Sequence, residues 1–154
     1  MTRQTIVIMV LLRVALGSFW MDHGIDKMSD GWITDDQLKA RLVRSSVTAT
    51  GLQKAYLEHF AVPASGALRY LVMFGELAIG LAFLAGFWMK PAAWGAGFMV
   101  LNFKFADGRL LDLNILGDPS FFPLLLTTLL IAYINFDRSW TLRRFFPILD
   151  RYDV

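Results

Sequence analysis

The sequence predicts an all-α protein: an integral membrane four-helix bundle with short extramembrane helices in its long first loop. Hydrophobic residues make up 56% of the 154 residues and charged residues only 18%, so the chain is more apolar than an average soluble domain. Its apolar runs are each about long enough to cross a hydrocarbon core of roughly 30 Å. The length leaves no room for a separate catalytic domain, so we predict one transmembrane domain over residues 1–154.

The first apolar run predicts a transmembrane helix over residues 5–24. Arg13 interrupts the run, and MDHGIDK follows it where a signal peptide would have a small-residue cleavage site. We therefore expect this helix to be retained as a membrane anchor.

The long connection over residues 28–62 predicts helices of its own, because a loop of this length inside a compact bundle is seldom structureless. In TDDQLKARLVRS (34–45), Thr34 and Gln37 have the spacing of a capping box. VTATGLQKAYLEHF (47–60) has the apolar spacing of a second short helix.

The remaining apolar runs predict helices over residues 66–89, 91–106 and 120–137. Only a very short link separates the first two, and Pro91 suits the first turn of a helix, so we expect an antiparallel hairpin. The basic and aromatic stretch over 139–154 is typical of an interfacial segment on the cytoplasmic leaflet.

The distribution of basic residues predicts the topology. On the side of the two termini, five cations lie within a few residues of span ends: Arg3, Lys90, Arg138, Arg143 and Arg144. On the opposite side, Lys39, Arg41 and Arg44 lie deep in the long loop among acids, where the positive-inside rule is weak, so the rule places the termini in the cytoplasm. We therefore predict a multi-pass protein of a bacterial or archaeal cytoplasmic membrane, with both termini cytoplasmic and residues 28–62 periplasmic.

Composition excludes several kinds of chemistry. The chain has no cysteine, which excludes disulfides and thiolate-bound zinc or iron–sulfur clusters. His23 and His59 match no metal or haem spacing, so we predict no haem and no metal site. The net charge of +2 is modest and its cations are scattered among acids, so we predict no nucleic-acid partner.

Two ionisable residues lie inside the apolar runs, Arg13 in the first and Glu76 in the second. Charged groups at mid-span face the bundle interior and find a partner. Counting the helical rise from the expected span ends places both at a similar depth, so we predict a buried Arg13–Glu76 ion pair. It either fixes the helix register alone or also faces a ligand.

A second group of charges is expected at the outer ends of the spans. Lys27, Arg69 and Arg109 are candidates for an anion site, and His23 is a candidate proton carrier near neutral pH. An ordinary ring of solvated charges is the alternative. Glu76 and Asn102, among aromatic residues, are candidates for the two polar contacts of a quinone.

The residues of two stretches resemble a known family. RVALGSFWMDHGIDK (13–27) is similar to the Arg…Gly…HG…K opening of DoxX/DoxD proteins, and FGELAIGLAFLAGFWMKPAAWGAGFMVLNF (74–103) is similar to their GE…G…G hairpin. DGWITDDQLKARL and FDRSWTL resemble the DoxD-like branch. The matching positions are Arg13, Gly17, Gly24, Lys27, Glu76, Gly80, Gly86 and Asn102.

The resemblance implies a four-helix membrane protein. For the DoxD-like branch it implies the membrane subunit of a thiosulfate:quinone oxidoreductase, which oxidises thiosulfate to tetrathionate, passes electrons to quinone and has a second subunit, DoxA. Our function hypothesis is therefore a quinone-linked oxidoreductase subunit acting on thiosulfate or another small anion. The alternative is a non-catalytic accessory subunit of a larger respiratory or photosynthetic complex. Expected partners are the lipid bilayer and either other subunits or further copies of the chain.

Overall fold

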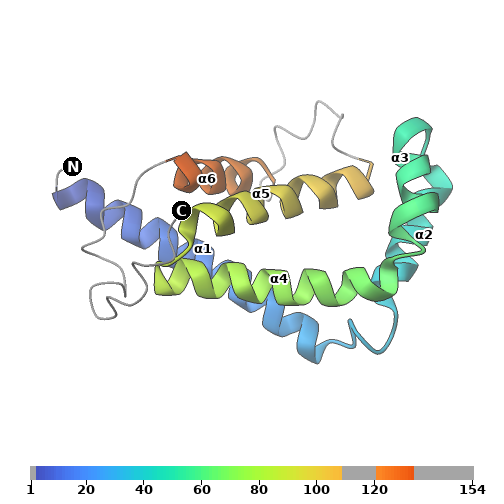
Figure 1. The fold of residues 1–154 in the computed structure, drawn as a ribbon, viewed down its shortest axis with the longest axis horizontal. Helices are drawn as coiled ribbons and strands as arrows, with labels where there is room; N and C mark the ends of the chain where they lie inside the picture. The colour runs from blue at the N-terminus through green and yellow to red at the C-terminus, as the bar shows by residue number, and fades with distance from the viewer. Residues whose placement is uncertain (1–2, 109–120, 134–154) are drawn as a thin grey trace.

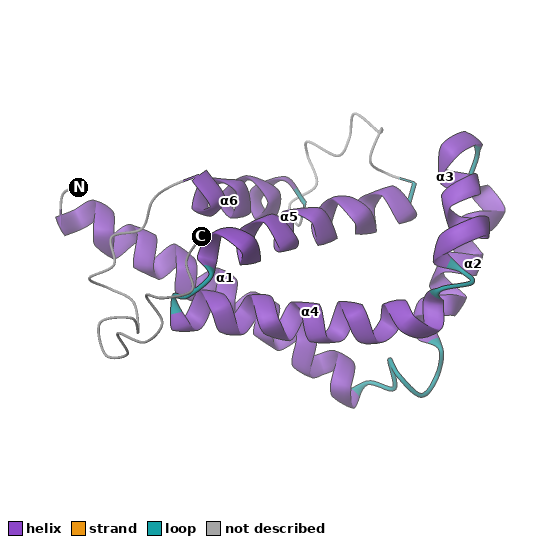
Figure 2. Ribbon diagram, in the orientation of Figure 1, coloured by secondary structure: helices purple, strands orange, loops and turns teal. Residues whose placement is uncertain are grey.

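The predicted all-α fold class is confirmed, because every regular element that the structure describes is a helix (Figure 2). A computed structural model describes residues 3–108 and 121–133. In chain order its elements are α1 (Arg3–Ser29), α2 (Gln37–Thr48), α3 (Gly51–Tyr56), the π-helix η1 (Leu57–Ala61), α4 (Ser65–Ala85), α5 (Met89–Ala106) and α6 (Phe122–Tyr133).

The first helix is longer than predicted. It continues past residue 24 to Ser29, because Gly24 is buried against α4 and does not end the helix. Lys27 is therefore a helical residue facing the bundle and not part of the loop. The next helix begins at Gln37, and its N-cap residue Asp36 makes no side-chain cap hydrogen bond, so the predicted Thr34–Gln37 capping box does not form.

The turn between α4 and α5 begins earlier than predicted. Gly86 adopts a left-handed φ of 74° and donates its N–H to the carbonyl of Ala82 at 2.8 Å, which ends α4 at Ala85. Trp88 also has a positive φ, of 48°. A glycine in the left-handed region is the common end of a helix, and here it outweighs the apolar pattern of the residues that follow.

α1 and α4 pack antiparallel and very close together at glycines. A Cβ atom at Gly17 would lie 2.9 Å from the backbone nitrogen of Leu84, and one at Gly80 would lie 2.7 Å from that of Met21. Contacts this short need glycine on one helix, as at other close helix crossings in membranes. The register of the two helices is therefore fixed by backbone contact.

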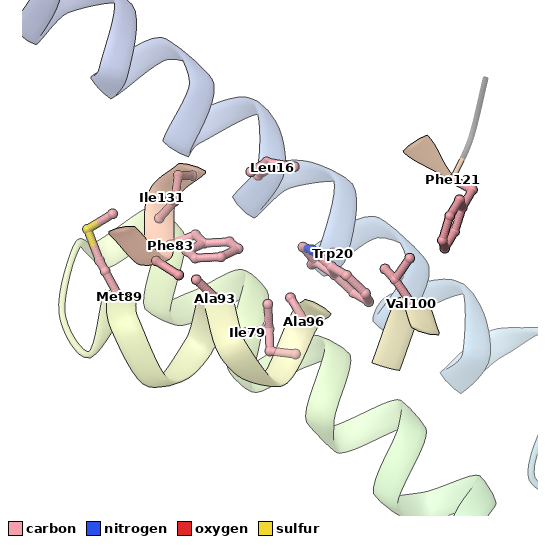
Figure 3. Close-up of a cluster of buried hydrophobic side chains, with 11 residues drawn as sticks. Leu16, Trp20, Ile79, Phe83, Met89, Ala93, Ala96, Val100, Phe121 and Ile131 are labelled. Atoms are coloured by element: carbon pink, nitrogen blue, oxygen red, sulfur yellow. The ribbon is translucent and has the colours of Figure 1, made fainter. Parts of the chain in front are cut away.

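The main core lies between α1, α4, α5 and α6 (Figure 3). Trp20 of α1, Phe83 of α4 and Ile131 of α6 are among its most deeply buried side chains, and small residues of α5 let the helices approach. Its buried members are Leu16, Trp20, Ile79, Phe83, Met89, Ala93, Ala96, Val100, Phe121, Ile131 and Ala132.

A second core closes one end of the bundle. There α2, α3 and η1 lie across the ends of α4 and α5 that are remote from their connecting turn (Figure 1). This outer cluster consists of Leu38, Leu42, Ala49, Leu57, Ala61 and Ala106. It brings the long connection against the bundle, so the predicted loop helices are part of the packed structure.

Among the described residues, two helices are long and apolar enough to cross a membrane: Val7–Ser29 and Ser65–Ala85. Phe122–Tyr133 is a shorter apolar helix. The predicted end of the fourth span and the interfacial segment over 139–154 lie outside the described residues.

Candidate functional site

A buried ion pair joins α1 to α4. The ammonium of Lys27 donates to both carboxylate oxygens of Glu76, at 2.9 and 2.7 Å. The side chain of Glu76 is only 2% exposed and that of Lys27 17%. The carboxylate is thus enclosed between apolar helices, whereas the ammonium keeps some access to solvent.

The ion pair predicted from the sequence, Arg13 with Glu76, is corrected by the structure, in which Lys27 is the partner of Glu76. Gly24 packs on Leu77, so the end of α1 around Lys27 lies beside Glu76. Arg13 precedes Lys27 by about four turns, roughly 21 Å at 1.5 Å per residue. It is buried on α1, but at another depth. The predicted pair assumed that the ends of the two helices lie level, whereas Lys27 is two residues from the end of α1 and Glu76 is eleven residues from the start of α4.

Trp32 lies between this ion pair and Arg69 of α4. The Lys27 ammonium lies 5.2 Å from the centre of the Trp32 ring, and the indole N–H donates to the backbone carbonyl of Arg69 at 3.1 Å. Such a ring stabilises a cation beside its face. Trp32 is a site residue that sequence analysis missed, although the DGW stretch that contains it was part of the family resemblance.

Arg69 is held by the segment that precedes α2. Its guanidinium donates to the carbonyl of Ile33 and to the carboxylate of Asp36, both at 2.6 Å. The structure therefore brings the predicted anion-binding residues Lys27 and Arg69 to the two sides of Trp32, but each cation already faces an acid. Arg109 lies outside the described residues.

His23 lies one turn before Lys27 and is exposed. Its Nδ1 is 2.9 Å from the carbonyl of Phe19, and its ring stacks on the Phe19 ring with centroids 4.1 Å apart. The described contacts of the imidazole are thus with Phe19, one turn earlier on α1, and not with Lys27 or Glu76.

Asn102 of α5 forms a second polar contact at the outer cluster. The hydroxyl of Tyr56 donates to the Asn102 side-chain oxygen at 2.8 Å. The rings of Phe60 and Phe105 lie 5.6 and 5.3 Å from that of Tyr56, measured between centroids. Tyr56 directly precedes η1, and π-helical turns are frequent at functional sites. Asn102 was predicted from the sequence as a site residue, but its contact with Tyr56 was not.

The ion-pair and Asn102 regions are neighbours. Trp32 and Tyr56 both pack against the outer cluster, so both polar contacts border the same apolar side chains. Within the described residues no group of three or more potential metal ligands is found.

Fold and site together define a helical membrane protein with a buried ion pair near one end. The DoxX family model matches residues 8–106, from α1 through α5, so the chain belongs to the DoxX family. The match confirms the predicted family, while the DoxD-like branch stays a prediction. The curated proteins and the solved structures that were compared give no significant match.

Proposed function

We propose that the chain is a membrane subunit of a quinone-linked oxidoreductase, with the Lys27–Glu76 pair at the polar end of the quinone site. The burial of this pair is the observation that carries the proposal. Removing ions from water costs several kcal/mol each, and ionisable groups inside apolar helices usually mark functional sites. The pair supplies a proton donor and a proton acceptor in contact, at 2.7 Å.

Two other side chains, those of Asn102 and Trp20, carry polar groups of the kind that bind a quinone carbonyl. Quinone reduction takes up two electrons and two protons, and the headgroup needs an apolar slot with donors for its carbonyls. Asn102 offers an amide beside the aromatic rings around Tyr56. The indole N–H of Trp20 is buried and has no hydrogen-bond partner among the described residues. Buried donors are rarely left unsatisfied, so Trp20 supports a ligand with a carbonyl acceptor.

The identity of the electron donor rests on the family resemblance. For thiosulfate, two molecules would join through a new sulfur–sulfur bond to give tetrathionate and release two electrons to the quinone. Lys27 and Arg69 are the described cations nearest the proposed site. Thiosulfate would have to compete with the carboxylates of Glu76 and Asp36 for them.

This pairing also favours the second candidate function, a non-catalytic accessory subunit. Cations that are already neutralised by neighbouring acids fix one helix to another and leave little attraction for a free anion. In such a subunit the same contacts would only hold the long connection on the bundle while the apolar surface packs on a larger membrane complex.

Our proposed topology follows the basic residues: α1 and α4 cross the cytoplasmic membrane, both termini are cytoplasmic, and the ion pair lies toward the periplasmic end. Protease added to sealed inside-out vesicles should then trim the C-terminal segment. Trimming only in right-side-out vesicles would show that the topology is the opposite of the one proposed.

The function is tested by measuring quinone reduction in membranes with and without the chain, with thiosulfate as donor. The purified chain should also retain extracted quinone. We expect Glu76→Gln to reduce both signals and Arg41→Gln, which breaks an exposed ion pair, to leave them unchanged. A chain that carries no quinone, co-purifies with a larger complex and leaves the reduction rate unchanged would support the accessory function instead.

A further inference from the structure

The helix α2 has apolar residues on two opposite sides. Leu38 and Leu42 are buried in the outer cluster. At 100° per residue, Val47 lies 180° around the helix from Leu38, with Val43 and Ala40 beside it. These three residues, which we call the free face of α2, are exposed, Val47 to 80%. A helix on a water-facing surface carries polar residues on this side.

Cations border the free face on both edges. Lys39 and Arg44 flank the valines on the helical wheel, are exposed, and form no ion pair within the described structure. The residues from 37 to 57 contain four basic and no acidic side chains. Of these, Arg41 pairs with Asp107 at 2.6 Å and Lys54 pairs with Glu58 at 3.8 Å, so the charge without a described ion pair lies beside the valines.

Hydrogen bonds hold the start of α2 at the end of a membrane-spanning helix. Arg69, in the second turn of α4, binds the carbonyl of Ile33 and the carboxylate of Asp36, the N-cap residue of α2. The α4 helix is one of the two described helices that are long and apolar enough to span a membrane, and α2 lies across its end (Figure 1). These bonds place α2 at the level where the bilayer surface is expected.

From these observations we propose that the free face of α2 lies in the headgroup region of the membrane, with Lys39 and Arg44 bound to anionic lipid phosphates. An apolar stripe edged by cations is the pattern of helices that lie in a membrane interface. Anionic headgroups complement the unpaired charge, and the contact with α4 keeps the helix within their reach. The inference is independent of the proposed redox function.

The cysteine-free chain allows a direct test. A spin label is attached at Val47→Cys, and at Thr48→Cys as the control, because Thr48 is exposed but lies about 100° away on the helix. The full chain is reconstituted into phosphatidylcholine vesicles with and without phosphatidylglycerol. Collisions with lipid-soluble oxygen and a water-soluble nickel chelate are then measured. If Val47→Cys lowers the thermal stability, Val43→Cys replaces it.

In phosphatidylglycerol vesicles we expect the label at Val47 to be shielded from nickel and accessible to oxygen. The label at Thr48 should collide more often with nickel and less often with oxygen. Lys39→Gln with Arg44→Gln should weaken the docking roughly fivefold per cation, and high salt should act in the same direction. Equal nickel accessibility at both positions in these vesicles would overturn the proposal. Shielding in native membranes but not in lipid vesicles would also overturn it, because a protein partner would then cover the face.

Discussion

Replacing Lys27 and replacing Glu76 should lower the free energy of unfolding by different amounts. Lys27→Met leaves a carboxylate that is 2% exposed without a counter-charge. Removing one partner of a buried pair costs about 3–5 kcal/mol. Because the site of Lys27 is 17% open, we take the lower end, about 3 kcal/mol of unfolding free energy.

Glu76→Gln leaves the charge on the more accessible partner. The Lys27 ammonium still has the Trp32 ring beside it and some solvent, so we expect about half the cost of Lys27→Met. The double variant Lys27→Met with Glu76→Gln should be no less stable than Lys27→Met alone, because it contains no unpaired buried charge.

The assay is thermal unfolding of the purified chain in detergent, followed by tryptophan fluorescence. For a chain of this size, about 1 kcal/mol shifts Tm by roughly 2–4 °C, so Lys27→Met should lower Tm by roughly 6–12 °C. Arg41→Gln is the matched control, because its bond to Asp107 is equally short, at 2.6 Å, but its side chain is 59% exposed. Exposed pairs contribute at most about 1 kcal/mol.

If Lys27→Met and Arg41→Gln lowered Tm equally, burial would not be what makes the Lys27–Glu76 pair important for stability. A double variant that loses the sum of the two single effects would refute the direct coupling of Lys27 and Glu76.

Three further variants and one control variant test other contacts. Gly80→Ala should lower Tm by several degrees because its Cβ would lie 2.7 Å from the Met21 nitrogen, whereas Gly66→Ala, with no atom within 4 Å, should leave Tm unchanged or raise it. Tyr56→Phe removes the hydrogen bond to Asn102 and should cost about 1 kcal/mol in the same unfolding assay; no change would mean that the bond does not stabilise the fold. Trp20→Phe should reduce the quinone retained on purification; unchanged retention would remove Trp20 from the proposed site.

The helices were predictable because their signal is local. Apolar runs and the short link at Pro91 indicated α1, α4, α5 and the hairpin from the sequence alone. The π-helix η1 was not predictable, since a π-turn differs from an α-turn only in its hydrogen bonds. The end of α1 was misplaced because charged residues resembled a loop when no partner helix was known.

The candidate site was predicted in its residue types but not in its pairing. Glu76 was recognised as buried because a carboxylate among apolar residues needs a partner, but the partner depends on the register of two helices. That register is set by Gly17 and Gly80 through contacts distant in sequence. The ring of Trp32 joins Lys27 and Arg69 only after the chain has folded, and no spacing in the sequence indicates such a contact.

The closest helix pair, α1 and α4, is separated by the whole long connection, which has a consequence for biosynthesis. At about 5–20 residues per second, a ribosome needs roughly 2–10 s to extend the chain from the end of α1 to Glu76. During that interval the glycine-lined side of α1 and the charge of Lys27 have no α4 to meet. The first helix must therefore wait, in the membrane or at the insertion machinery, for a partner that is made later.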